Sequence, residues 1–241
     1  GYGAYIRSSD YSNFNISAYN TESFGGSVQF VLPINEISQL SLSASLDQTD
    51  LQTDLLSSRQ LLDFISTEGS TFESLTLGAS WTRNSLNRGL FPTAGTLNVV
   101  SASATVPGSS ITYGRLSHRF KYYRPLFDNF IFALRTEIGG LFAYGDTETP
   151  PPYENFYAGG LNSVRGFEQN SLGPKAVYNS IYSNYNRPTG GTYAWEGGLD
   201  FICPIPFLED SRSVRSSLFL DAGNVFSDNC QSYETNCSEL D

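Results

Sequence analysis

Apolar and polar residues alternate along much of this chain with a period of two. From Leu40 to Leu46 every second residue is Leu or Ala, and serines lie between them. The segment from Ser74 to Thr82 repeats the pattern, with two leucines, an alanine and Trp81 on one side. A β-strand places successive side chains on opposite faces, whereas a helix would scatter these residues around its circumference. The alternation therefore predicts an all-β chain.

Between residues 111 and 145 the polar side of this pattern becomes charged. One predicted strand carries Arg115, Arg119 and Lys121 on one side, and the next carries Arg135 and Glu137 on its inner side. A soluble sandwich could also expose a charged face, so alternation alone does not distinguish it from a membrane barrel. The predicted strands are about 10–15 residues long, against about 5–6 in soluble sheets, which favours a transmembrane barrel.

Composition limits the alternatives. None of the apolar runs approaches the roughly 20 residues that a membrane-spanning helix needs, which excludes a helical membrane protein. Barrel strands need only about 9–11 residues each, and their lumen-facing residues keep the mean hydropathy low. A formal net charge of −10 argues against nucleic acid as a partner, because phosphate binding needs clustered Lys and Arg. With no start Met and no signal peptide, we expect a piece of a longer chain.

Nine strands follow from the pattern. Their connections alternate between short turns, such as 35–37 and 125–129, and long polar segments at 50–70 and 146–188. Outer-membrane barrels show this alternation of short periplasmic turns and long extracellular loops. An odd count predicts that the barrel is incomplete here and that flanking strands are missing at both ends. The predicted strands lie at 1–11, 24–34, 38–49, 72–83, 94–106, 111–124, 128–145, 190–203 and 213–226.

The longest connection, at 146–188, has the composition of an ordered loop. Its glycines allow tight backbone turns, and its aromatic residues can anchor it on an apolar surface. Arg165 lies among them and carries a planar cation with five N–H donors. Such a loop should fold inward and dock on the barrel wall. The glycines and aromatic anchors are Gly159, Gly160, Gly166, Phe156, Tyr157 and Phe167.

Part of this loop resembles the loop signature of the outer-membrane assembly and two-partner-secretion superfamily. The resemblance extends to the flanking segments 156–160 and 173–178, and to the segments 87–95 and 220–226. It implies an antiparallel transmembrane β-barrel of about sixteen strands, integral to the bacterial outer membrane. The signature residues are Val164, Arg165, Gly166 and Phe167.

The same resemblance implies a function. That function is the folding and insertion of other β-barrel proteins into the outer membrane, without enzymatic activity and without a cofactor. The implied partners are unfolded outer-membrane proteins as clients, accessory lipoproteins and membrane lipid. Periplasmic repeats upstream of the barrel would receive the clients and the lipoproteins.

By resemblance, Arg165 also reaches into the barrel lumen and pairs with acidic side chains on the wall. The period of two places Glu196 and Asp200 on the inner face of one strand and Asp221 on the inner face of the next. Asp200 and Asp221 are the preferred partners, and Glu196 is a third candidate. In a partly dehydrated lumen, loss of one partner of such a pair costs on the order of 3–5 kcal/mol.

Other candidate sites have simpler interpretations. Cys230 and Cys237 could close a small disulfide loop in an oxidising compartment or remain free loop thiols. A metal site is not expected, since the only histidine, His118, points outward on a predicted strand. Acidic pairs such as Glu196 with Asp200 fit a wet barrel wall better than acid–base catalysis.

Three other functions remain open. A two-partner secretion transporter shares the arginine loop but exports one dedicated protein, and a translocation-and-assembly barrel is a second relative. A porin or a surface-binding barrel is more remote, because porins lack the extended loop motif.

Overall fold

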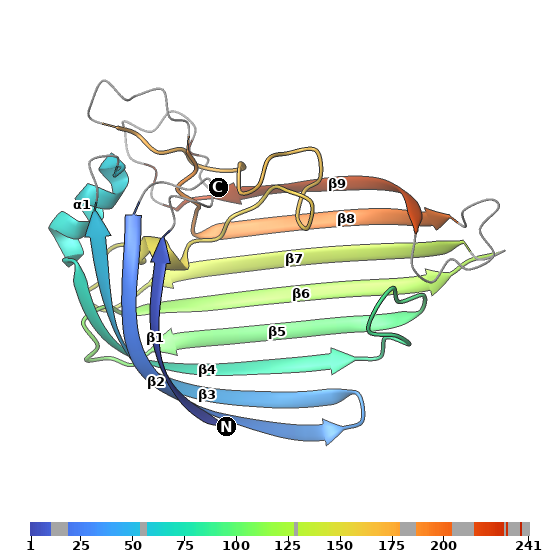
Figure 1. The fold of residues 1–241 in the computed structure, drawn as a ribbon, viewed down its shortest axis with the longest axis horizontal. Coiled ribbons are helices and arrows are strands. Elements are labelled where there is room, and N and C mark those ends of the chain that lie inside the picture. Colours follow the sequence, from blue (N-terminus) through green and yellow to red (C-terminus); the bar gives the residue numbers. More distant parts are fainter. Residues whose placement is uncertain are drawn as a thin grey trace.

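Nine antiparallel strands follow one another in chain order across a single sheet (Figure 1). The computed structural model describes residues 1–10, 19–53, 57–127, 130–178, 187–203, 215–228, 230 and 237. The predicted all-β antiparallel fold and its nine strands are confirmed within these residues. The strands are β1 (Tyr2–Asp10), β2 (Tyr19–Asn35), β3 (Ser38–Thr53), β4 (Thr71–Asn84), β5 (Gly95–Thr105), β6 (Tyr113–Pro125), β7 (Ile131–Ala143), β8 (Tyr193–Cys203) and β9 (Ser216–Phe226).

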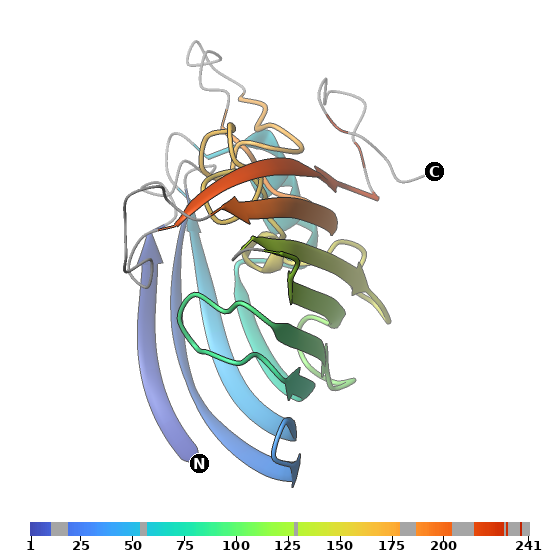
Figure 2. The ribbon, with the colours of Figure 1, turned by 90° about the vertical axis from the view of Figure 1, so that its right-hand side faces the viewer.

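The sheet curls into an open trough with β1 and β9 at its two edges (Figure 2). The turn between Asn35 and Ser38 lies at one end of the strands. The two longest connections, from β3 to β4 and from β7 to β8, lie at the other end and contain the helix α1 (Arg59–Glu68) and the short 3-10 helix η2 (Pro152–Glu154) (Figure 1). In the predicted turn at 125–129, Asp128 and Asn129 lie outside the described residues.

The two faces of the sheet differ as the alternation predicted. Leu46, Leu77 and Leu116 on the convex face are between 51% and 64% exposed, although they are large and apolar. On the concave face, serines of β3, β4, β5 and β6 line a cavity of about 210 Å³. An apolar outside with a polar inside is the arrangement of a membrane barrel, not of a sandwich with a dry core.

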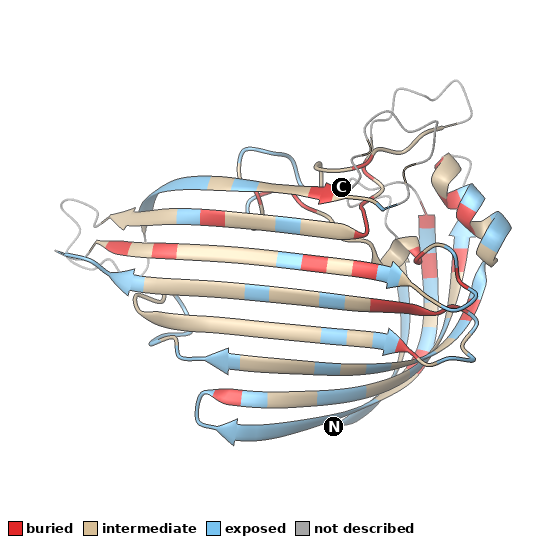
Figure 3. Ribbon diagram, turned by 180° about the vertical axis from the view of Figure 1, so that it is seen from behind, coloured by how far each residue is buried: buried red, intermediate tan, exposed pale blue. Residues whose placement is uncertain are grey.

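Most of the apolar core lies at the end of the trough near α1 (Figure 3). Tyr19 of β2 and Leu141 of β7 belong to the same buried cluster, although they lie on strands that are far apart in the sheet. The Tyr19 hydroxyl also donates to the carbonyl of Pro152, at 3.3 Å. The cluster therefore fills the concave side only at the end near α1, and it explains why β2 and β3 run beyond their predicted ends. Its remaining members are Leu51, Leu61, Phe64, Phe72, Ile111 and Tyr113.

The helix α1 corrects the sequence interpretation, which expected only a polar loop at 50–70. The Ser58 side chain caps its start by accepting from the Leu61 amide at 3.3 Å, and Gly69 ends it with φ of 97°. Leu61 and Phe64 face the core cluster with helical spacing. In the described part of the chain, every helix is too short or too polar to cross a membrane.

The cysteines and His118, which are the remaining candidate site residues, lie away from the centre of the trough. Cys230 and Cys237 form a disulfide, with a Cα–Cα distance of 5.7 Å, and Cys203 at the end of β8 is a free thiol. His118 on β6 contacts the Asn98 side chain at 3.0 Å and stacks on Phe120. The described residues hold no cluster of His, Cys, Asp and Glu suited to a metal ion.

Candidate functional site

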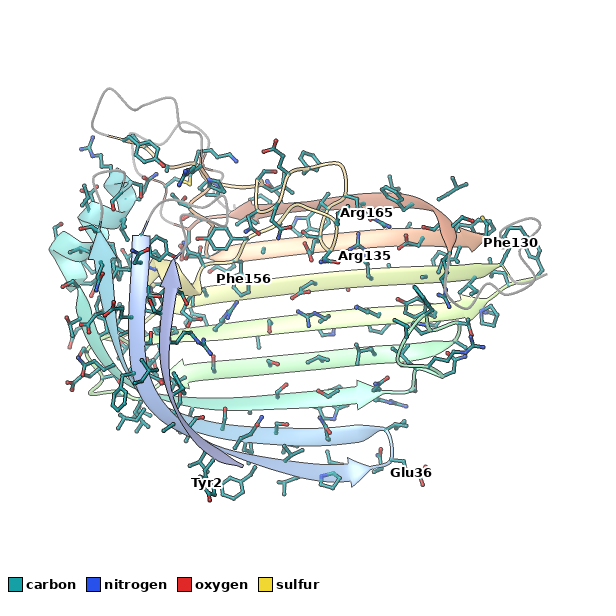
Figure 4. All side chains as sticks on the ribbon, viewed as in Figure 1. Tyr2, Glu36, Phe130, Arg135, Phe156 and Arg165 are labelled. Atoms are coloured by element: carbon teal, nitrogen blue, oxygen red, sulfur yellow. A yellow bond between two sulfur atoms is a disulfide. The ribbon has the colours of Figure 1, made fainter. Side chains whose placement is uncertain are left out.

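The long connection between β7 and β8 folds back over the concave side of the sheet (Figure 4). Its central part forms a tight turn, in which the Gly160 amide donates to the Val164 carbonyl at 3.2 Å and the Ser163 amide donates to Gly160 at 3.1 Å. Gly159, Gly160 and Gly166 have φ values of 109°, 104° and 93°. These values lie in the left-handed region that favours glycine, so the glycine content of the motif has a direct backbone cause. We call residues 159–173 the arginine loop.

Arg165 lies between carboxylates of two adjacent strands. Its Nη1 donates to Asp200 Oδ1 at 2.8 Å. Its Nε and Nη2 donate to the two oxygens of Asp221 at 2.6 and 2.8 Å, and its backbone amide donates to Asp221 at 3.0 Å. The Asp221 side chain is 2% exposed, against 17% for Asp200. The structure thus brings together Arg165 and the two partners that the sequence favoured.

Strand register explains why these groups meet. Asp200 of β8 is paired with Phe219 of β9, and Gly198 of β8 is paired with Asp221. The residues are inward on both strands, so the guanidinium spans from one carboxylate to the other. Its Cζ lies 3.7 Å from the centre of the Phe219 ring, which adds a cation–π contact. Hydrogen bonding to Asp221, followed by that to Asp200, raises the pKa of Arg165 above its ordinary value.

Glu196 binds a different residue of the loop, not Arg165. The sequence named it as a third partner of Arg165, but its carboxylate accepts a hydrogen bond from the Ser163 hydroxyl. Val164 is buried at 2% exposure over Gly223, where a Cβ would lie 2.9 Å from the Val164 side chain. Ser163, Val164 and Arg165 therefore each contact different residues of the barrel wall.

One aromatic prediction needs correction, and one aromatic residue of the site was not predicted. Phe167 was expected to anchor the loop, yet its side chain is 54% exposed. Tyr123 was not considered as part of the site, but it lies on the concave face and lines a cavity of about 700 Å³ together with Arg165 and Asp200. Its inward direction follows from the same period-two register that places Arg119 and Lys121 inward.

The start of the loop has a separate attachment. Arg115 of β6 donates to Glu154 at 3.3 Å, and its guanidinium lies 4.4 Å from the centre of the Phe156 ring. Phe156 packs directly over Gly139 of β7, where a Cβ would overlap the ring. Burial raises the pKa of Glu154 above its ordinary value, and the charge of Arg115 opposes this shift. The sequence interpretation missed this attachment because Glu154 lies outside the signature.

The helix α1 holds the later part of the connection. The Gln60 side-chain amide donates to the Lys175 carbonyl at 2.9 Å and accepts from the Val177 amide at 3.0 Å. At the other end of the helix, the Glu68 carboxylate accepts from the Glu148 amide at 2.7 Å. The helix therefore contacts both limbs of the connection. The sequence could have indicated this only if the helix itself had been predicted.

The chemistry of the site is that of docking. The carboxylates of Asp200 and Asp221 are engaged by a guanidinium that stays charged at any physiological pH, so they are poorly suited to proton transfer. What the arrangement can do is hold a loop in one position inside the trough. A bidentate arginine is directional and cannot be replaced by the point charge of a lysine without loss.

One known protein family matches this chain over nearly its full length. Residues 1–239 match the family model described as the Omp85 superfamily domain. The chain is 32% identical over 250 residues to the outer membrane protein assembly factor BamA of Neisseria meningitidis serogroup B, covering 99% of this chain and 30% of that protein. It is 29% identical over 147 residues to the sorting and assembly machinery component 50 homolog of Mus musculus, covering 59% of this chain and 29% of that protein.

Solved structures show the same fold. The BamA structure from Haemophilus ducreyi lacking POTRA domains 1–3 superposes with a TM-score of 0.81 at 26% identity, covering 94% of this chain and 45% of that one. CdiB from Acinetobacter baumannii gives a TM-score of 0.50 at 14% identity, covering 89% of this chain and 33% of that one, and this likeness is one of fold alone. The chain spans less than half the length of each of these relatives.

Proposed function

Because the chain belongs to the Omp85 superfamily, we propose that it is part of the transmembrane barrel of a protein that folds and inserts β-barrel proteins into the bacterial outer membrane. The observation that carries the proposal is the arginine loop docked on the wall through Arg165, Asp200 and Asp221. The match to an outer membrane protein assembly factor over nearly the whole chain supports it.

The apolar convex face and polar concave face suit a barrel in the outer membrane, with lipid outside and water inside. A client strand that enters lipid must pair its backbone groups as it does so, because unpaired groups are costly there. Pairing and burial of client strands are themselves favourable, so assembly by this route needs no nucleotide and no catalytic residue. The proposed partners are unfolded outer-membrane proteins, accessory lipoproteins and lipid.

The role of the arginine loop in this proposal is mechanical. Docking fixes the loop against β8 and β9 and so defines the shape of the lumen beside them. An undocked loop would leave Asp200 without its Arg165 cation and would remove one of the two arginines that face Asp221, at a cost that favours the docked state. Val164, Gly166 and Phe167 complete the signature around this cation.

The experiment uses the full-length protein in its host. The chromosomal copy is depleted, wild type or R165A is supplied, and several unrelated outer-membrane barrels are quantified by mass spectrometry. R119A is the matched control, since Arg119 is a wall arginine that pairs with Glu137 at 2.8 Å on the same concave face. We expect the levels of many outer-membrane barrels to fall together on depletion. Wild type and R119A should restore these levels, whereas R165A should not restore them fully.

The alternative is a transporter that exports one dedicated protein, as in two-partner secretion. In that case the outer-membrane barrels would stay level on depletion while a single secreted protein disappeared. That result would reject general assembly as the function.

A further inference from the structure

We propose that Arg135 of β7 is a second positioning residue for the arginine loop, which it holds by binding both the Asp221 carboxylate and the loop backbone. The proposal rests on the proposed function for its biological meaning, but its geometry can be tested without any assembly assay. The sequence interpretation treated Arg135 only as an inward charge on a wet wall. Figure 4 shows Arg135 and Arg165 on the same side of the sheet.

Arg135 reaches Asp221 by crossing an entire strand. Arg135 is paired with Gly198 of β8, and Gly198 is paired with Asp221 of β9, so the three residues lie in one row across the sheet. A Cβ at Gly198 would lie 2.5 Å from Arg135 Nε and 2.5 Å from Asp221 Oδ1. The absence of a side chain at this position is therefore what lets the ion pair form over β8.

The contact between Arg135 and Asp221 balances the charge of the site. Arg135 Nη2 lies 2.8 Å from Asp221 Oδ1, the same oxygen that Arg165 Nη2 contacts. The contact is an ion pair between the Arg135 guanidinium and the Asp221 carboxylate. Two arginines then face two carboxylates, Asp200 and Asp221, and the cluster is neutral. Without Arg135, one net negative charge would remain beside a carboxylate that is 2% exposed.

Arg135 also binds the loop itself. Its Nη1 donates to the Asn162 carbonyl at 3.0 Å, three residues before Arg165. The neighbouring residue Leu161 is 83% exposed and, with Asn162, lines the cavity of about 700 Å³. Arg165, Val164 and Ser163 attach the turn to β8 and β9, whereas the bond from Arg135 to Asn162 attaches its preceding residue to β7. Arg135 therefore sets how far the loop projects into the lumen.

The test measures loop position in the full-length protein in lipid bilayers. Nitroxide labels are placed at Leu161→Cys and at Glu36→Cys, an exposed turn residue between β2 and β3, with Cys203 replaced by Ser. The width of the distance distribution between the labels reports how firmly the loop is held. R135Q removes the charge, R135K keeps it, and R119Q removes a wall arginine that pairs with Glu137.

Two glycine variants separate the contact from the charge. G198A inserts a methyl group between Arg135 and Asp221 and leaves every charge in place. G197A is its control on the adjacent residue, where the nearest atom to an added Cβ is 3.7 Å away. Both replacements are of glycines in β8, so a general effect of alanine on the strand would appear in both.

We expect R135Q and G198A to increase the undocked population of the loop roughly tenfold, which corresponds to the loss of one charge-assisted contact. R135K should fall between R135Q and wild type, while R119Q and G197A should match wild type. A distance distribution for R135Q that equals that of wild type would overturn the proposal. Loss of loop position in R135Q with normal barrel levels in the depletion assay would leave this proposal standing and count against the proposed function of the loop.

Discussion

Replacing Asp221 by Asn should release the arginine loop far more than replacing Asp200 by Asn. Asp221 accepts three hydrogen bonds from Arg165, at 3.0, 2.6 and 2.8 Å, and is 2% exposed. Asp200 accepts one, at 2.8 Å, and is 17% exposed. Removing one partner of a buried ion pair costs about 3–5 kcal/mol. A single charge-assisted hydrogen bond contributes about 1.5–3 kcal/mol, and solvent reduces this at the more exposed Asp200.

Hydrogen exchange of the loop amides measures this difference. The Gly160 amide donates to Val164 and the Leu172 amide donates to Ala158 inside the folded connection, so both are protected only while the loop is folded. Where exchange proceeds through rare opening, its rate follows the opening equilibrium. A cost of about 3 kcal/mol for D221N corresponds to a rate increase of more than about a hundredfold, and about 1.5 kcal/mol for D200N corresponds to roughly tenfold.

E137Q is the control for this comparison, because Glu137 is a wall carboxylate that pairs with Arg119 on the concave face. Its exchange rates in residues 158–172 should equal those of wild type. The reasoning from bond number and burial is refuted if D200N accelerates exchange as much as D221N, or if neither variant differs from E137Q.

Two further predictions concern the ends of the connection. G139A should lower the thermal unfolding midpoint of the folded barrel in a gel-shift assay, because its methyl group would overlap the Phe156 ring at a cost of about 1–3 kcal/mol. G140A should leave the midpoint unchanged, because its Cβ would lie 3.5 Å from its nearest neighbour. Q60L should raise hydrogen exchange at the Val177 amide about thirtyfold, since it removes two hydrogen bonds worth about 1 kcal/mol each. Unchanged exchange would show that α1 does not hold this limb.

The sequence predicted the strands well for a physical reason. A strand with lipid on one side and water on the other must alternate at every residue, as Leu40 to Leu46 do, so the signal is strong along its whole length. The helix α1 was missed because its 10 residues are too short a segment to show a clear helical period. A signal was nevertheless present: Ser58 as a cap, Leu61 and Phe64 with helical spacing, and Gly69 at the end.

The candidate site was predictable where a motif supplied the residues. Arg165 and its two carboxylates came from the resemblance together with the inward faces of β8 and β9. The pairing of Glu196 with Ser163 could not be predicted, because alternation gives the face of a residue and not its height along the barrel. Height depends on strand register, which is fixed by turns and loops that the sequence alone does not measure.

Register also explains why Arg135 could be identified as inward but not as a partner of Asp221. Neighbouring strands permit direct pairs, as between Arg119 and Glu137, which are opposite in register. A pair across an intervening strand needs an empty position between the two side chains. Gly198 provides it, because it is the inward residue of β8 in the same row. A glycine at an inward position between two opposite charges therefore has a specific meaning in a barrel wall: it permits an ion pair that spans three strands, and a larger residue there would separate the charges.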